Sequence, residues 1–435
     1  MPQKQRTYMC IDMKSFYASV ECAERGLNPF ETNLVVADLS RGRNALCLAV
    51  TPKMKALGVK NRCRLSDIPE SIEYIAAPPR MQLYIEYAAD IYAIYLDYFA
   101  PEDIHVYSID ESFIDATAYL GVYGLTPKQL AKKLMNEIAD KLHIPSTAGI
   151  GTNLYLAKIA LDITAKHASE HIGYLDEELF RRELWDHEPL NDFWQIASGT
   201  VRRLEHYGIR TMRGITRAAP ELLYREFGKD AELLIDHAWG RESCLMEDIK
   251  NYCPKTRSVS FSQILPSDYS FDKARIVMSE MILNGCHELM KRGVITKKLW
   301  ICIGYTRDLI PASKSSARLM SAVNVSSVIQ PATLELFDRI ADRTTPIRRL
   351  AIAFGDVVDE GCGGYDFFTD WSGIEREKKK ERAVLEIKGK HGKNAVLRGT
   401  SFLEGATQRE RNEMIGGHRA GYDDERRTGE AIRRV

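Results

Sequence analysis

The sequence predicts a multidomain α+β protein, and three observations support this. The chain has 435 residues, which is too long for one ordinary core and suggests roughly three domains. Short runs of β-forming residues alternate with segments whose apolar residues recur every three or four positions. Between about residues 257 and 354, four strand-like runs and two helices follow in the order β-α-β-β-α-β. That order is typical of a small two-layer domain with one open sheet face.

The bulk composition indicates a globular, intracellular protein. No stretch approaches the ~20 apolar residues that a membrane span needs, and the polar start Met1–Thr7 has no apolar signal-peptide core behind it. The nine cysteines are scattered and include no Cys-x-x-Cys. This favours reduced, mostly buried thiols over a disulfide framework or a zinc site.

The net charge is zero but unevenly distributed. Residues 1–249 hold 28 basic and 36 acidic residues, whereas residues 250–356 hold 16 and 9. Residues 357–370 hold four acidic and no basic residues, and residues 371–435 hold 16 basic and 11 acidic ones. An acidic N-terminal half joined to a basic C-terminal half suggests a metal-binding region followed by a region that binds a polyanion. Chance, or a role in solubility, is the alternative.

Two acidic positions stand at the ends of predicted strands. Tyr8–Met13 reads as a short buried strand followed by a helix that Gly26 stops, so Asp12 lies at a strand-to-helix junction. In Val106–Asp115 the adjacent carboxylates of Asp110 and Glu111 interrupt β-forming residues. One interpretation is a hairpin with an acidic tip. The other is a site where strand ends distant in sequence bring three carboxylates to a divalent metal.

The next elements are two strands, 34–37 and 45–50, and a helix from Thr51. Thr51 as N-cap, Pro52 in the first turn and Gly58 after the helix give a consistent start and stop. This helix carries Lys55, which either contacts a bound anion or is solvated. Residues 80–99 and 126–142 show helical periodicity and are expected to pack on the sheet.

Three later segments could contact phosphate or nucleotide. Gly149-x-Gly151 before a helix is weakly suggestive of a dinucleotide site, but the third glycine is absent. In the Arg- and Leu-rich region 170–245, a glycine hairpin at Ser198-Gly199-Thr200 with Arg202 nearby could contact a phosphate, or be a structural helix-turn-helix. The open face of the basic 250–356 region is a candidate DNA platform. The last dozen residues are expected to be disordered.

Taken together, Asp12 with Phe16–Glu21, the Ser108–Glu111 stretch and Leu156–Ala160 resemble the Y family of translesion DNA polymerases, over about residues 6–355. The continuation, with Ala383–Gly405 and Met414–Arg419, looks most like the UmuC branch. The resemblance implies a right-hand polymerase. Its parts would be a palm (1–21 and 79–168), fingers (22–78), a helical thumb with a helix-hairpin-helix-like segment (169–246), a βαββαβ little finger (250–356) and a C-terminal tail (357–435).

The resemblance also implies an activity: low-fidelity, DNA-directed addition of deoxynucleotides opposite damaged bases, in SOS-type mutagenesis. Asp12, Asp110 and Glu111 would bind two Mg²⁺ ions with the Met13 carbonyl, because three carboxylates suit two-metal phosphoryl transfer. The nucleotide-binding residues would be Lys55, Lys158, Phe16 and Tyr17, with Tyr17 as a steric gate against a ribose 2′-hydroxyl. Three positions depart from relatives. Lys14 replaces a second acid, and Ala49 and Pro52 replace phosphate-contacting residues.

The implied partners are primer-template DNA, deoxynucleoside triphosphates, a sliding clamp and a UmuD-like accessory protein, in the bacterial cytoplasm at the nucleoid. DNA contacts are expected at Gly199, Thr200, Arg202 and Arg257. The stretch Tyr365, Asp366, Phe367 and Phe368 is similar to a clamp-binding pentapeptide, although Gly364 stands where Gln is usual. Two alternatives remain: a non-catalytic DNA-binding regulator on a polymerase fold, and a nucleotide cyclase. The cyclase is disfavoured because it would need neither the thumb hairpin nor the basic domain.

Overall fold

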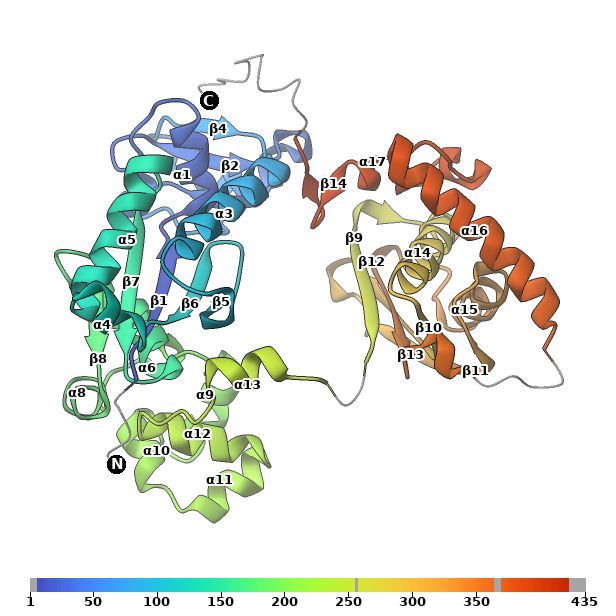
Figure 1. The fold of residues 1–435 in the computed structure, drawn as a ribbon. Helices are drawn as coiled ribbons and strands as arrows, with labels where there is room; N and C mark the ends of the chain where they lie inside the picture. Colours follow the sequence, from blue (N-terminus) through green and yellow to red (C-terminus); the bar gives the residue numbers. More distant parts are fainter. Residues whose placement is uncertain (1–5, 255–256, 364–368, 422–435) are drawn as a thin grey trace. The chain divides into compact units, whose positions relative to one another are not determined.

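The computed structural model describes residues 6–254, 257–363 and 369–421, and the chain divides into two compact units (Figure 1). The first unit runs to Tyr252 and resumes at His418, and the second is Cys253–Gly417. The second unit is therefore inserted, in sequence, within the first. No helix among the described residues is long and apolar enough to cross a membrane. All nine cysteines are free thiols, and five of them are buried.

The first unit is built on a five-stranded sheet in the order β5-β6-β1-β7-β8. The central strand β1 is antiparallel to both β6 and β7, and its buried apolar residues contribute to the packing on the sheet. The strands are β1 (Tyr8–Met13), β5 (Ile104–Val106), β6 (Glu111–Asp115), β7 (Ser146–Gly151) and β8 (Ile172–Leu175). The helices of this part are α1 (Phe16–Ala23), α3 (Met81–Leu96), α4 (Tyr119–Tyr123), α5 (Pro127–Leu142), α6 (Leu154–Ile159) and α7 (Ala165–His167).

The glycines of β7 let a helix approach the sheet closely. A Cβ added at Gly149 would lie 2.2 Å from the Ala157 carbonyl oxygen, and one at Gly151 would lie 2.1 Å from the Ala157 nitrogen. Only a residue without a Cβ fits this contact. The Gly-x-Gly pattern is thus explained by packing, because these glycines let α6 lie directly against β7. Helix α6 carries Lys158.

A small sheet in the order β3-β2-β4 forms a separate core within residues 34–77, where fingers are predicted. Its elements are β2 (Leu34–Ala37), β3 (Cys47–Val50), β4 (Ile75–Ala77) and the helix α2 (Pro52–Ala56). The predicted start of α2 is confirmed, since Thr51 is its N-cap, accepting a hydrogen bond from the Met54 N–H at 3.4 Å, and Pro52 is its first residue.

Short helices follow around a core that includes Phe180, Phe193 and Leu204. They are α8 (Glu177–Glu183), α9 (Ser198–Glu205), α10 (Met212–Arg217), α11 (Pro220–Phe227) and α12 (Asp230–Ala238), with α13 (Met246–Asn251) beyond them. The predicted hairpin at Gly199 is wrong, because Gly199 lies inside the first turn of α9. The turn between α9 and α10 instead contains Gly208, whose φ of 73° favours glycine.

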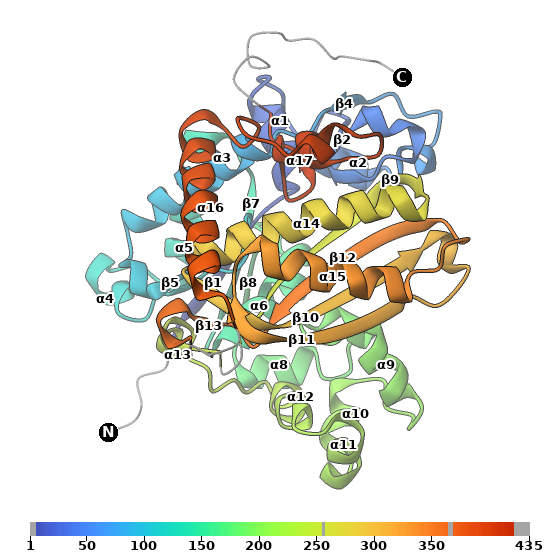
Figure 2. The same cartoon turned by 90° about the vertical axis from the view of Figure 1, so that its right-hand side faces the viewer.

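The second unit has the predicted β-α-β-β-α-β order, with its sheet ordered β11-β10-β12-β9. Two helices cover one face of this sheet, and a third, α16, packs against α14 (Figure 2). The elements are β9 (Val259–Tyr269), α14 (Phe271–Lys291), β10 (Val294–Tyr305), β11 (Ser313–Val323), α15 (Ser326–Ile340), β12 (Ile347–Gly355), β13 (Val358–Asp359), α16 (Trp371–His391), α17 (Gln408–Asn412) and β14 (Met414–Ile415).

The chain returns to the first unit through β15 (His418–Arg419). The Gln82 N–H, in the first turn of α3, donates to the Ala420 carbonyl at 2.9 Å, and Ala420 is buried. This returning segment therefore contacts the start of the helix that packs behind the sheet. The predicted disorder of the last dozen residues falls on positions outside the described residues.

Replacing Gly149 with Ala should destabilise the first unit by about 3 kcal/mol, because the new methyl group would overlap the backbone of α6. Urea unfolding of the full chain checks this. The matched control is Gly121→Ala, since Gly121 lies within α4 and has open space around its Cα. The control should change stability by about 1 kcal/mol or less. Equal effects of the two substitutions would contradict the packing role of Gly149.

Candidate active site

The antiparallel pairing of β1 and β6 brings the predicted acids together. Asp12 stands opposite Glu111 in the register. The Met13 N–H donates to the Asp110 carbonyl at 2.9 Å, which fixes the backbone next to both acids. Asp110 ends the turn between β5 and β6, where the Ser108 hydroxyl donates to its Oδ1 at 2.6 Å. The two interpretations of Asp110 and Glu111, an acidic hairpin tip and part of a group of three acids, thus describe the same turn.

The three carboxylates repel one another. Burial, followed by the charges of Asp110 and Glu111, raises the pKa of Asp12 from 3.8 to about 7. No described residue donates a hydrogen bond to the Asp12 carboxylate from its side chain, so the strand end carries excess negative potential that a cation would relieve.

Lys158 supplies part of the missing positive charge. Its Nζ lies 2.8 Å from Glu111 Oε2 and 3.1 Å from Asp162 Oδ1. Although burial lowers the pKa of Lys158, Asp162 and Glu111 outweigh it, and the net shift is upward. The thiol of Cys10 donates to the other oxygen of Glu111 at 3.1 Å, so both oxygens of that carboxylate have partners.

The described part of the chain contains no ready-made group of three or more His, Cys, Asp or Glu side chains placed as metal ligands. Glu111 instead faces Lys158 and Cys10. The donor set still suits a divalent cation, because all of its ligand atoms are carboxylate or carbonyl oxygens. The raised pKa of Asp12 also shows that the negative charge here is only partly compensated.

Two further lysines lie near these acids. Burial lowers the pKa of Lys55 on α2, while Asp12 and Asp110 act in the opposite direction. Burial and the charge of Lys55 likewise lower the pKa of Lys14. Lys14 and Lys55 therefore lie close enough to interact with each other and with Asp12. This basic pair beside an acidic cluster can hold an anion next to a cation.

The aromatic pair Phe16 and Tyr17 begins α1, directly after β1. Phe16 is buried, whereas the ring of Tyr17 stacks on Tyr84 of α3, with centroids 4.5 Å apart and 17° between planes. Burial, with a smaller effect of Asp110, raises the pKa of Tyr17, which places its ring beside the acids.

Tyr84 is held by a buried ionic network that sequence reasoning missed. Its hydroxyl donates to Glu21 at 2.7 Å, and Arg80 donates two hydrogen bonds to the same fully buried carboxylate at 2.9 and 2.8 Å. Arg25 also forms an ion pair with Glu21. The available signal was an acid four residues after Tyr17 on the apolar side of α1, since such an acid needs a cationic partner.

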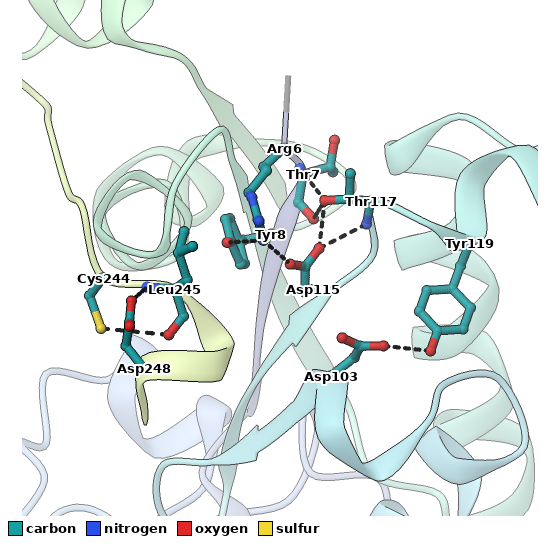
Figure 3. Close-up of polar contacts among 10 residues, drawn as sticks. All are labelled: Arg6, Thr7, Tyr8, Asp103, Asp115, Thr117, Tyr119, Cys244, Leu245 and Asp248. Carbon is teal, nitrogen blue, oxygen red and sulfur yellow. Dashed lines mark hydrogen bonds and ion pairs between the residues drawn. The ribbon is translucent and has the colours of Figure 1, made fainter. Parts of the chain in front are cut away.

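The far end of β6 carries a different acid, Asp115, which is held by structural contacts (Figure 3). Arg6 Nη1 lies 3.1 Å from Asp115 Oδ2, and the Thr117 N–H donates to Oδ1 at 3.0 Å. Asp115 is five residues of the chain away from Asp110 and pairs with Tyr8, at the opposite end of β1 from Asp12.

The open face of the second unit is flat and partly basic. Alternate residues of its four strands face away from the helices, and many are small, such as Ser260, Ser262, Ala351 and Ala353. Basic side chains also occupy this face, namely Lys298, Lys314, Arg318 and Arg349. Basic side chains gathered on one face are typical of surfaces that contact a phosphate backbone.

The remaining predicted residues are distributed over both units. Gly199, Thr200 and Arg202 lie in the first turns of α9, and Arg257 precedes β9 and lies 3.2 Å from Asp359. These positions are consistent with DNA contact, which stays a prediction. The predicted clamp-binding residues Tyr365, Asp366, Phe367 and Phe368 lie outside the described residues.

Comparison with known proteins identifies the family. Residues 11–162 match the impB/mucB/samB family, and residues 256–366 match the C-terminal domain of that family. The chain belongs to the Y family of translesion DNA polymerases. A Bacillus subtilis (strain 168) protein named for UV-damage repair, UvrX, is 28% identical, over 96% of this chain and 98% of its own length. DNA polymerase IV 2 of the same strain is 29% identical, over 95% and 99%.

The fold agrees with this assignment. A Y-family DNA polymerase chimera of known structure, Dbh-Dpo4(243-245)-Dbh, superimposes with a TM-score of 0.63 at 22% identity, covering 81% of this chain and 99% of the chimera. The enzyme is a DNA-directed DNA polymerase, and its substrates are primer-template DNA and deoxynucleoside triphosphates. The predicted α+β polymerase fold is confirmed.

Replacing Arg80 with Met should destabilise the first unit by about 3 kcal/mol. The buried carboxylate of Glu21 would lose the cation that donates two hydrogen bonds to it. Replacing Glu21 with Met as well should recover much of this loss, since an apolar pair leaves no uncompensated charge. Denaturant unfolding of both variants measures the effect. A single variant as stable as the wild type would show that the network contributes little.

Proposed function

We propose that this polymerase extends primers opposite damaged template bases by two-metal phosphoryl transfer at Asp12, Asp110 and Glu111. The observation that carries the proposal is that the pairing of β1 with β6 brings Asp12, Asp110 and Glu111 to one half-buried strand end. There burial, followed by the charges of the other two acids, raises the pKa of Asp12 to about 7. Such a cluster is unfavourable unless a cation joins it. Its position between basic residues suits a triphosphate-metal substrate.

Each group near the site has a proposed task. Asp12, Asp110, Glu111 and the carbonyl of Met13 would hold two Mg²⁺ ions, which would activate the primer 3′-hydroxyl and neutralise the leaving pyrophosphate. Lys55, with Lys14 beside it, would bind the triphosphate oxygens. Lys158 now pairs with Glu111, so it would orient that carboxylate and add positive charge near the phosphates.

Sugar selection is assigned to Tyr17. A ring can exclude an extra hydroxyl group only while it is held in place. The stacking of Tyr17 on Tyr84 supports this role, because it holds one face of the Tyr17 ring. Tyr84 would act as a positioning residue, held in turn by Glu21. Phe16 would complete the floor beneath the sugar.

DNA would lie against the basic open face of the second unit, including Arg257, and against the start of α9 at Gly199, Thr200 and Arg202. The UmuC-like branch, a role in SOS mutagenesis, docking to a sliding clamp and a UmuD-like accessory protein remain proposals from the sequence resemblance. A location in the bacterial cytoplasm at the nucleoid is likewise a proposal, supported by DNA as the substrate.

Replacing Asp110 or Glu111 with Ala should lower primer extension by at least about 10³-fold, while primer-template affinity stays within about twofold, because these acids act on the metals and not on the duplex. Extension gels and fluorescence anisotropy measure the two quantities. The matched control is Asp115→Asn, on the same strand but bound to Arg6 and Thr117, which should extend normally. Full activity in either alanine variant would refute the assignment.

Replacing Tyr17 with Ala should raise incorporation of ribonucleotides relative to deoxynucleotides by about tenfold or more, because the 2′-hydroxyl would no longer meet the ring. Tyr84→Leu should relax the same selectivity partially, and Tyr84→Phe should preserve it, since the stacked ring remains. Single-nucleotide incorporation kinetics give the ratio. Unchanged selectivity in Tyr17→Ala would remove the gate role, whereas a Tyr84→Leu variant like wild type would remove only the positioning role.

A further inference from the structure

A cavity of about 220 Å³ lies in the second unit, on the side of the sheet that the helices cover. Its walls come from α14, from α16 and from the segment that follows α16. It lies within residues 279–408, on different elements from the open sheet face and in a different unit from the acids. Its walls are partly apolar, through Leu283, Val384, Val396 and Leu397.

His287 lines this cavity without a partner. Its side chain is 6% exposed, yet it makes no hydrogen bond or ion pair with any described residue. Burial, then the charges of Lys388, Arg398 and Lys291, lower the pKa of His287 to about 4, so the ring is neutral at pH 7. A neutral imidazole that is buried and unpartnered calls for a ligand or an ordered water.

Positive charge surrounds this histidine. Lys388 also lines the cavity, is half-buried and forms no ion pair with the described residues, and its pKa is lowered by burial and by Lys291 and Arg398. Arg398 is fixed beside them, because its guanidinium donates to Gln330 at 2.6 Å and to Ser326 at 2.8 Å. The C-terminal ends of α14 and α16 place only about half a negative charge each nearby. The charges that act on His287 itself are those of the three cations, whereas Glu280, Glu377 and Glu381 line other parts of the cavity wall.

The acids of the cavity do not favour a cationic ligand instead. Glu280 Oε2 accepts hydrogen bonds from the backbone of Thr407 and Gln408, and Glu381 Oε1 accepts them from Ser326. The remaining oxygen of each carboxylate is buried, so a molecule in the cavity does not reach it. The third acid of the cavity, Glu377, lies 3.7 Å from Lys380 Nζ and so faces a cation of its own. Among the charged and imidazole groups of the lining, His287 and Lys388 are the ones that no described residue pairs with.

We propose that this cavity binds a small organic acid, with its carboxylate at His287 and Lys388 and its flat apolar body against Leu283, Val384 and Leu397. The volume supports this size, because a cavity of about 150 Å³ accommodates benzene and the extra space here suits one charged substituent. The ligand would join α14 to α16, and so tie the segment after residue 369 to the little finger.

The test uses the full-length chain and three molecules of nearly the same shape: benzoate, benzamide and benzylamine. Calorimetry, with NMR of the His287 ring, should show benzoate binding with a dissociation constant of about 1 mM or tighter. Benzamide should bind about tenfold more weakly, and benzylamine should not shift the His287 resonances. Equal affinity for benzoate and benzamide, or no benzoate binding at about 20 mM, would overturn the proposal.

Variants locate the site. Lys388→Gln should weaken benzoate binding by about tenfold, and Lys388→Arg should restore it, because the charge returns. Lys390→Gln is the matched control, since Lys390 lies at the same end of α16, is exposed and does not line the cavity. It should bind benzoate like wild type. Unchanged binding in a folded Lys388→Gln chain, or equal losses in both glutamine variants, would place the ligand elsewhere.

Discussion

The burial and mutual repulsion of three carboxylates at one half-buried strand end are the constraint on which the first unit depends. Raising the pKa of Asp12 from 3.8 to about 7 corresponds to roughly 4 kcal/mol of unfavourable interaction with its charged form. This loss of stability begins as the pH rises above about 4 and is complete above 7, because the unfolded chain ionises there first. The arrangement is therefore less stable at neutral pH than it would be without these acids, unless cations join it.

The surrounding fold limits that repulsion without removing it. Lys158 reaches Glu111 only because α6 lies directly on β7, and α6 lies there because Gly149 and Gly151 have no Cβ. On the other side, the stack of Tyr17 on Tyr84 ties the start of α1 to α3 through the buried charge of Glu21. Close packing and a satisfied ionic network thus hold the three acids in place, including Asp12, whose carboxylate accepts no hydrogen bond from a described side chain.

Sequence reasoning could predict features that depend on a periodic pattern or on residues that start and stop an element. Thr51 with Pro52, and the alternation that gives the βαββαβ order, depend on local preferences and were predicted correctly. It could not predict contacts that depend on the partner element. The Gly149-x-Gly151 pair looked like a nucleotide signal but is a packing device, Gly199 proved to be helical, and Arg80 meets Glu21 from 59 residues away. The three acids could be proposed as one site from their places at strand ends, but the choice between that site and an acidic hairpin tip depended on the family resemblance.

The central claim is that the acids at the end of β1 form a cation site, because burial and the neighbouring acids leave the charge of Asp12 uncompensated. The most direct measurement is a ¹³C NMR titration of the Asp12 carboxyl group, with and without Mg²⁺. The account predicts a pKa of about 7 without the metal, and a fall of about two units or more when Mg²⁺ binds, because the cation favours the ionised form. A pKa that is raised but does not respond to Mg²⁺ would contradict the claim.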